Sequence, residues 1–219
     1  IKTPALAAVL RAIAARGSAA LHEGPVAADI VRRVRGHAAN RGLLSEADLA
    51  GYVPRKREAI CTDWKTLWRV CGFPPPSSGH LALMQILGIL ERSTPVAAPR
   101  SEGLPSADWL HAYSEAARLA YADRALYVAD PDFTAPPAGR WTSLLDDAYL
   151  KQRAALIGPR SMGTAVPGRP EGAAVTFAPQ SEQRESGTSH ISVVDGDGRA
   201  LAMTSTIEDA FGARLMSDG

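Results

Sequence analysis

The residues best suited to chemistry lie near the carboxyl end of the sequence, where Thr188, Ser189 and His190 follow Gly187. A hydroxyl becomes a nucleophile when a base accepts its proton, and a threonine that begins a chain has such a base in its own α-amine. That amine titrates at about pH 7.7–8, so part of it is neutral at physiological pH. A Ser189–His190 catalytic pair is excluded, because neighbouring strand residues point to opposite faces. The triplet therefore indicates either a threonine nucleophile, activated by cleavage after Gly187, or a surface hairpin with polar decoration.

The stretch from residue 188 to residue 206 predicts a β-hairpin with a tight turn at Gly196-Asp197-Gly198. The glycines supply the positive φ that such a loop needs. Asp195, Asp197 and Glu208 could also suggest a calcium loop, but glycines stand at alternate positions where further ligands would be required. We therefore predict a turn and no metal site.

The alternation of residue types also predicts the register of this hairpin. If Asp195 pairs with Arg199, one face becomes apolar and the other polar, whereas a slip of one residue would mix the two. The predicted pairs are Ile191–Met203, Val193–Leu201, His190–Thr204 and Thr188–Thr206. Thr206 therefore lies directly across from Thr188, with Glu208 one step further along the same face. His190 is interpreted as a structural residue.

The rest of the chain reads mainly as helices. Periodicity and capping residues predict helices over 4–16, 25–40, 46–49, 79–91 and 107–128, with Ser77 as the cap of the fourth. Short strands are predicted in "REAICTDWK" and "LWRVCGF". Asp123 and Arg124 are expected to form an internal ion pair or cap contact. The run from 158 to 187 is rich in proline and glycine and predicts an exposed, mobile loop.

Composition excludes several classes of function. The 219 residues are 46% hydrophobic and 21% charged with a net charge of +1, which disfavours nucleic acid and anionic membranes as partners. No apolar run reaches the roughly 18 residues of a membrane span, and the first residues predict a helix and not a signal peptide. Cys61 and Cys71 are expected on adjacent strands, where a disulfide is possible but small buried thiols are the favoured interpretation.

Three motifs in order resemble the γ-glutamyltransferase family of the N-terminal nucleophile hydrolases. "TSHISVVDGDG" is similar to the start of the family's small subunit, "FPPPSSGHLALMQILGILE" to a helix of its large subunit, and "EAARLAYADRALYVADPDF" to a further large-subunit segment. "LHEGPVAADIV" and "LSEADLAGY" extend the likeness over essentially the whole chain. His80 departs from the pattern, since a second glycine is common there.

The resemblance implies an α+β fold that forms part of an αββα sandwich, with a helix-rich first half and the hairpin at the C-terminal end. It implies a precursor that cuts itself between Gly187 and Thr188, so that residues 1–187 belong to a large subunit and 188–219 begin a small one. Thr188 would then carry a γ-glutamyl group from glutathione or a related amide to water, an amino acid or a peptide, without a cofactor. Thr206 matches the threonine that hydrogen-bonds the nucleophile. Glu208 stands where many members bind the substrate ammonium group with asparagine.

The same resemblance leaves two alternatives open. Cephalosporin acylases, which remove a glutaryl-like side chain, share the chain plan and the mechanism. The 32 residues from Thr188 to Gly219 are fewer than a sandwich needs, so an inactive remnant that never cleaves is the other alternative, and the chain is interpreted as part of a longer sequence. Periplasmic or secreted localisation follows from the resemblance alone.

Overall fold

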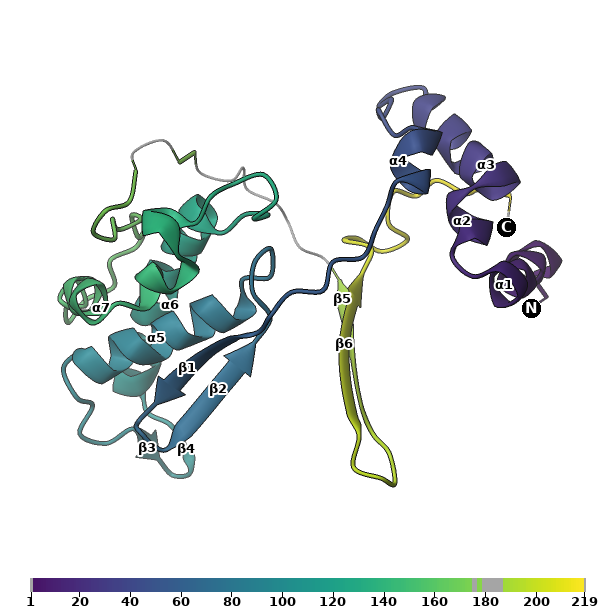
Figure 1. Cartoon of the computed structure of the whole chain (residues 1–219). Coiled ribbons are helices and arrows are strands. Elements are labelled where there is room, and N and C mark those ends of the chain that lie inside the picture. The colour runs from purple at the N-terminus through teal and green to yellow at the C-terminus, as the bar shows by residue number, and fades with distance from the viewer. Residues whose placement is uncertain (1, 175–176, 179–186, 219) are drawn as a thin grey trace. The chain divides into compact units, whose positions relative to one another are not determined.

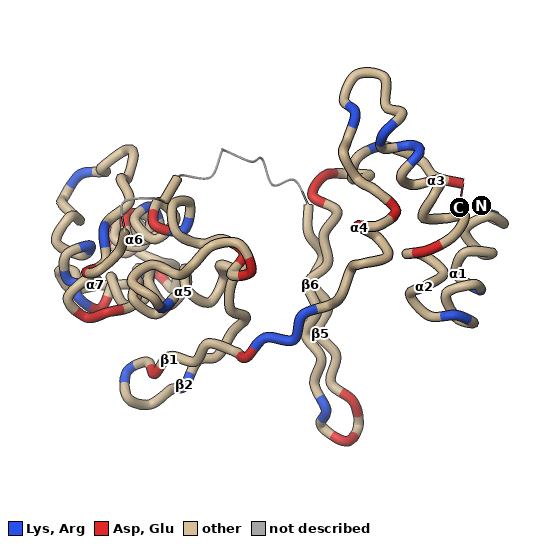
Figure 2. The backbone as a smooth tube through the Cα atoms, turned by 45° about the horizontal axis from the view of Figure 1, so that its top comes forward, with Lys and Arg blue, Asp and Glu red and all other residues tan. Residues whose placement is uncertain are grey.

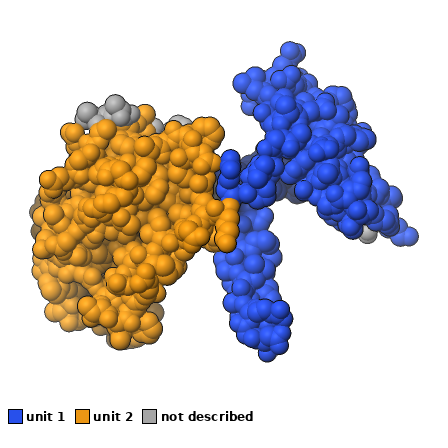
Figure 3. Space-filling view, viewed as in Figure 1, with its two compact units in different colours: residues 1–55, 183–219 blue, residues 56–182 orange. Residues whose placement is uncertain are grey.

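The computed structural model describes residues 2–174, 177–178 and 187–218 (Figure 1). The chain divides into two compact units, residues 1–55 with 183–219 and residues 56–182 (Figure 3). In chain order the helices are α1 (Pro4–Arg16), α2 (Ala19–His22), α3 (Gly24–Arg35), α4 (Glu46–Ala50), α5 (Gly79–Arg92), α6 (Ala107–Tyr127) and α7 (Asp147–Ala154). Short 3-10 helices cover Pro137–Gly139 and Trp141–Leu145.

The strands form three separate two-stranded antiparallel sheets in the described part of the chain. The pairs are β1 (Ile60–Trp64) with β2 (Trp68–Gly72), β3 (Arg100–Ser101) with β4 (Leu104–Pro105), and β5 (Thr188–Val194) with β6 (Ala200–Thr206). The mixture of helices and small sheets agrees with the predicted α+β class. The αββα sandwich remains a prediction.

Local signals mark the ends of α1 and the start of α4 in the first unit. Proline occupies the first turn of α1, and Gly17 follows its end, as the sequence predicts. Helix α4 starts with a capping box in which Ser45 and Asp48 bond each other's backbone amides. Helix α3 is shorter than predicted. It ends at Arg35, whose side chain reaches forward to the carbonyl groups of Leu43 and Leu44.

The core of the second unit lies between α5, α6 and α7. Its buried side chains are Ile86, Ile89, Ala116, Leu119, Ala120, Leu150 and Ala154. Helix α5 approaches α7 closely at Gly88, where a Cβ atom would lie 2.7 Å from Leu150 Cδ1. Most residues of α5 are buried, but its predicted cap is wrong. The residue preceding the helix is Ser78, not Ser77, and its hydroxyl makes no capping bond.

Two buried carboxylates on α6 hold the segment that follows α7. Asp123 accepts hydrogen bonds from the Tyr149 hydroxyl at 2.8 Å and the Gly168 amide at 2.7 Å, and it pairs with Arg153 at 3.1 Å. The expected ion pair of Asp123 with its neighbour Arg124 is therefore wrong, since adjacent helix residues point in different directions. Burial raises the pKa of Asp123, whereas Arg153 and the other donors oppose that shift.

The second buried carboxylate is Glu115, which accepts the Met162 amide at 2.7 Å. Pro170 and Ala173 are themselves buried. Most residues of the described part of 158–187 are exposed and lie outside helices and strands, while the bond to Glu115 and the burial of Pro170 and Ala173 attach this part to the helices. The mobility of the loop stays a prediction. Residues 175–176 and 179–186 of the predicted loop lie outside the described residues.

The hairpin of β1 and β2 carries a disulfide. The register places Cys61 directly opposite Cys71, with a Cα–Cα distance of 4.1 Å, and the two sulfur atoms are bonded. The favoured interpretation of two buried thiols is therefore wrong, and Cys71 is exposed. Next to this bridge His80 is buried against Gly72 and contacts Thr62 Oγ1 at 3.1 Å, so a glycine in β2 leaves room for the histidine.

The second long hairpin, β5–β6, has the predicted register. Thr188 pairs with Thr206, His190 with Thr204 and Ile191 with Met203. Gly198 has a φ of 80° at the turn, and both charge signs meet at the tip (Figure 2), where Arg199 binds two aspartates. Every residue of both strands is exposed within the described part of the chain.

Candidate active site

The hairpin β5–β6 places the candidate nucleophile at its open end. Thr188 is the first residue of β5 and Thr206 is the last of β6, and the two are directly paired. Directly opposed residues have Cβ atoms about 4.5–5.5 Å apart. The tight turn at the other end sets this register, so local sequence alone brings the two hydroxyl groups to the same face.

The Thr206 hydroxyl makes two hydrogen bonds that orient it. It accepts from the Glu208 amide at 3.0 Å and donates to the carbonyl oxygen of Gly187 at 2.7 Å. Because a hydroxyl has a single proton to donate, that proton points at the peptide group preceding Thr188. A donor in this position polarises the carbonyl that Thr188 would attack in a self-cleavage. Sequence reasoning expected Thr206 beside the Thr188 hydroxyl and missed this contact, which remains compatible with the predicted one.

Glu208 contributes to this geometry through its backbone. Its φ of 72° lies in the left-handed region, which turns the chain so that its amide reaches back to Thr206. Nothing in the sequence marks that conformation, since glycine or asparagine is the usual signal. The carboxylate is exposed, and its predicted bond to a substrate ammonium group remains a prediction.

His190 and Thr204 form a neighbouring pair on the same face. His190 Nδ1 lies 2.8 Å from Thr204 Oγ1. This contact uses the histidine within the hairpin, as the structural interpretation of His190 requires. Thr188, Thr206 and Glu208 are all exposed, so this face of the hairpin is open to solvent in the described part of the chain.

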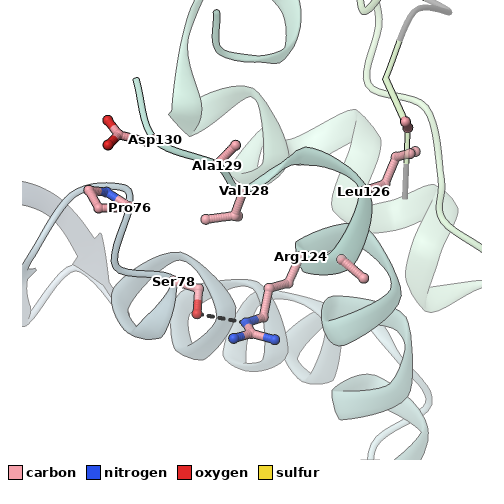
Figure 4. Close-up of a pocket in the computed structure, with 9 residues that line it drawn as sticks. Pro76, Ser78, Arg124, Leu126, Val128, Ala129 and Asp130 are labelled. Carbon is pink, nitrogen blue, oxygen red and sulfur yellow. Dashed lines mark hydrogen bonds between the residues drawn. The ribbon is translucent and has the colours of Figure 1, made fainter. Parts of the chain in front are cut away.

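A cavity of about 420 Å³ in the second unit gathers residues from two of the sequence motifs (Figure 4). Ser78 comes from the stretch before α5 and Arg124 from the end of α6, and Arg124 Nε donates to Ser78 Oγ at 2.8 Å. This bond connects the start of α5 with the end of α6, which supports a packing role for Ser78.

The described residues show no cluster of three or more histidine, cysteine or acidic side chains that could hold a metal ion. In the same residues, no helix has the length and apolar character that crossing a membrane would demand.

Comparisons with known proteins confirm the resemblance. A sequence model described as gamma-glutamyltranspeptidase matches residues 1–219. A glutathione hydrolase proenzyme of Pseudomonas sp. (strain A14) is 36% identical over 215 residues, covering 98% of this chain and 34% of the relative. The Acylase ACY 1 proenzyme of Pseudomonas sp. (strain SE83) is also 36% identical, over 213 residues that cover 97% of this chain and 34% of the relative. The chain thus spans about a third of the length of these curated relatives.

A solved structure is similar to this chain in its fold. The cephalosporin acylase from Bacillus halodurans has a TM-score of 0.69 and 26% identity, covering 93% of this chain and 32% of that one. The match of the family model over the whole chain is the decisive finding. The chain belongs to the gamma-glutamyltranspeptidase family.

Proposed function

We propose that the protein cuts itself between Gly187 and Thr188 and then transfers or hydrolyses γ-glutamyl groups through Thr188. The observation that carries the proposal is the hydrogen bond from the Thr206 hydroxyl to the Gly187 carbonyl oxygen, 2.7 Å long. The names of the relatives, which are proenzymes, support a precursor that is cleaved. In this proposal residues 1–187 end the large subunit and residues 188–219 begin the small one, within an αββα sandwich.

The self-cleavage begins with attack by the Thr188 hydroxyl oxygen on the Gly187 carbonyl carbon. Negative charge develops on the Gly187 oxygen, to which the Thr206 hydroxyl already donates a hydrogen bond. The C–N bond to Thr188 then breaks, the proton lost by the attacking hydroxyl passes to the Thr188 nitrogen, which becomes the free amine, and Gly187 is left as an ester on the Thr188 oxygen. Water hydrolyses this ester and frees both the Gly187 carboxylate and the Thr188 hydroxyl.

Turnover uses the same hydroxyl with the amine as its base. The Thr188 oxygen forms an ester with the γ-glutamyl group of glutathione or a related amide, the amide C–N bond breaks, and the donor's amine leaves with the proton that the Thr188 amine took from the hydroxyl. Water, an amino acid or a peptide then attacks the ester, receives the γ-glutamyl group and returns a proton to the Thr188 oxygen. Departure of Gly187 releases the Thr206 hydroxyl, which can turn to the Thr188 oxygen directly across the ladder. Glu208 pairs with the substrate ammonium group in this proposal.

A second candidate is hydrolysis of glutaryl side chains. Acylase ACY 1 and the glutathione hydrolase proenzyme are equally identical to this chain, at 36%. The likeness of the fold to the cephalosporin acylase structure also supports this second candidate. We place γ-glutamyl chemistry first because the carboxylate of Glu208 suits an ammonium group that a glutaryl chain lacks.

The cleavage is tested with the full-length protein on a denaturing gel. We expect two fragments, with threonine as the leading residue of the second by N-terminal sequencing. Thr188→Ala is expected to give a single band, and Ser189→Ala serves as the matched control that still splits. An unmodified protein that stays single would overturn the proposed cleavage and favour an inactive chain.

The substrate class is tested on the split protein with γ-glutamyl-p-nitroanilide and glutaryl-p-nitroanilide side by side. We expect a higher kcat/KM for the γ-glutamyl compound, and a selective loss on that compound in Glu208→Ala. Preference for the glutaryl compound would establish the second candidate instead.

A further inference from the structure

The chain beyond the hairpin reaches the helices of the first unit, to which the hairpin also belongs. After β6 it folds through turns closed by an ion pair between Asp209 and Arg214 at 2.8 Å. It then reaches helix α3, beside which the C-terminal end lies in both views (Figures 1 and 2). Residues 188–218 thereby contact a helix that precedes them by more than 150 positions.

The contact consists of two complementary polar interactions with Asp218. The Asp218 amide donates to Asp29 Oδ2 at 2.8 Å, while Arg33 Nη2 donates to Asp218 Oδ1 at 3.0 Å. Asp29 is only 12% exposed in its side chain and also pairs with Arg32 one helical turn away. The Asp218 amide, followed by the arginines, lowers the pKa of Asp29, so its carboxylate is charged at neutral pH.

Apolar burial contributes little to this segment within the described residues. Phe211 is 88% exposed and Met216 is 84% exposed. The polar interactions with Asp29 and Arg33 are therefore the best defined attachment of this segment to α3. One of these bonds is made by the Asp218 backbone amide and the other by its carboxylate. They therefore hold the main chain at this residue in place as well as pairing its side-chain charge.

We propose that Asp29 and Arg33 of α3 form an inter-fragment clamp that keeps the fragment starting at Thr188 bound to the fragment ending at Gly187. The inference rests on the proposed self-cleavage, which removes the covalent link between the two. Asp218 lies 12 positions after Thr206, so the clamp limits how far the open end of the hairpin can move from α3. Its partner is the segment 207–218 of the same precursor.

The test compares two arginines of the same helix in the full-length, split protein. Arg33 pairs with both Asp29 and Asp218, whereas Arg32 pairs with Asp29. Separation of the fragments is followed by size-exclusion chromatography at one fixed urea concentration. Arg33→Gln is expected to speed separation by about two- to fivefold, the range of a single surface ion pair. Arg32→Gln is the matched control and should stay close to the unmodified rate. Equal rates in all three proteins would overturn the clamp.

A second measurement separates failure of the clamp from failure of the cleavage. In the uncleavable Thr188→Ala protein, hydrogen exchange at the Asp218 amide reports the bond to Asp29 directly. Asp29→Ala is expected to accelerate that exchange by about tenfold. Unchanged exchange overturns the clamp whatever the gel shows. Accelerated exchange in a protein whose unmodified form never splits would instead locate the failure in the cleavage, and the clamp would have no fragments to join.

Discussion

The Thr206 hydroxyl illustrates how one side chain is oriented from both sides. The Glu208 amide occupies a lone pair of the oxygen, and the proton is left for the Gly187 carbonyl. In the proposed self-cleavage, Thr206 therefore acts first on the Gly187–Thr188 peptide bond. Its proposed contact with the Thr188 hydroxyl follows only after Gly187 has left.

Removing that hydroxyl should slow the self-cleavage. Thr206→Val keeps the shape and removes the donor, and losing one such donor costs roughly 10²- to 10³-fold in rate. We expect Thr206→Ser to cleave much faster than Thr206→Val. The rate is measured as the appearance of the fragment beginning at Thr188 on a denaturing gel.

Thr204→Val is the control for this prediction. Thr204 lies on the same face of β6, but its hydroxyl contacts His190. The Thr204→Val variant should therefore leave the cleavage rate nearly unchanged. If both valine variants were equally slow, the effect would come from weakening the hairpin and the assigned role of Thr206 would be wrong.

At the scale of elements, the two main hairpins differ in how far sequence predicts them. In β5–β6 the alternation of apolar and polar residues and the glycine turn fix the register, and hence the Thr188–Thr206 pair. In β1–β2 the turn residues Lys65 and Thr66 both have positive φ without glycine or asparagine to mark it. The register there could not be derived, and neither could the disulfide that depends on it.

The disulfide should contribute measurably to the stability of the second unit. Replacing Cys61 and Cys71 together with serine removes a cross-link over 10 positions, which is expected to cost about 2–3 kcal/mol. All four tryptophans, at 64, 68, 109 and 141, belong to this unit, so their fluorescence in urea reports its unfolding. Reductant should reproduce the loss in the unmodified protein and add nothing to the double variant. Equal stability of the two proteins would contradict the prediction.

The buried carboxylate of Asp123 on α6 should contribute more to the stability of the second unit than a surface acid of the same unit. Asp123→Ala leaves Arg153 buried without its partner, which is expected to cost about 3–5 kcal/mol in the same fluorescence assay. Asp147→Ala is the control, because its pairs with Arg92 and Lys151 are exposed and it should change little. Similar losses in both variants would argue against the buried network. The partners of Asp123 could not be read from the sequence, since Arg153 and Gly168 lie 30 and 45 positions away.

At the scale of the whole molecule, the chain leaves its first unit, builds the second and returns. Thr188, at which the proposed small fragment starts, therefore belongs to the same unit as the first helices. Family motifs and local periodicity predict most helices and the candidate nucleophile. The contact of Asp218 with Asp29 has no local signal at all, because 189 positions separate the two residues.

The exposed hairpin has a consequence for the 219-residue polypeptide handled by itself. Ile191 is 48% exposed and Leu201 is 56% exposed, and each strand of β5–β6 has one edge without a partner in the described chain. Such edges act as templates on which a strand from another molecule can add. We expect concentration-dependent self-association by light scattering, reduced more by Val193→Lys on the apolar face than by Val194→Lys on the opposite one. A monomer at every concentration would contradict this. An unpaired strand edge that can accept a strand of its own protein can also accept a strand of another molecule.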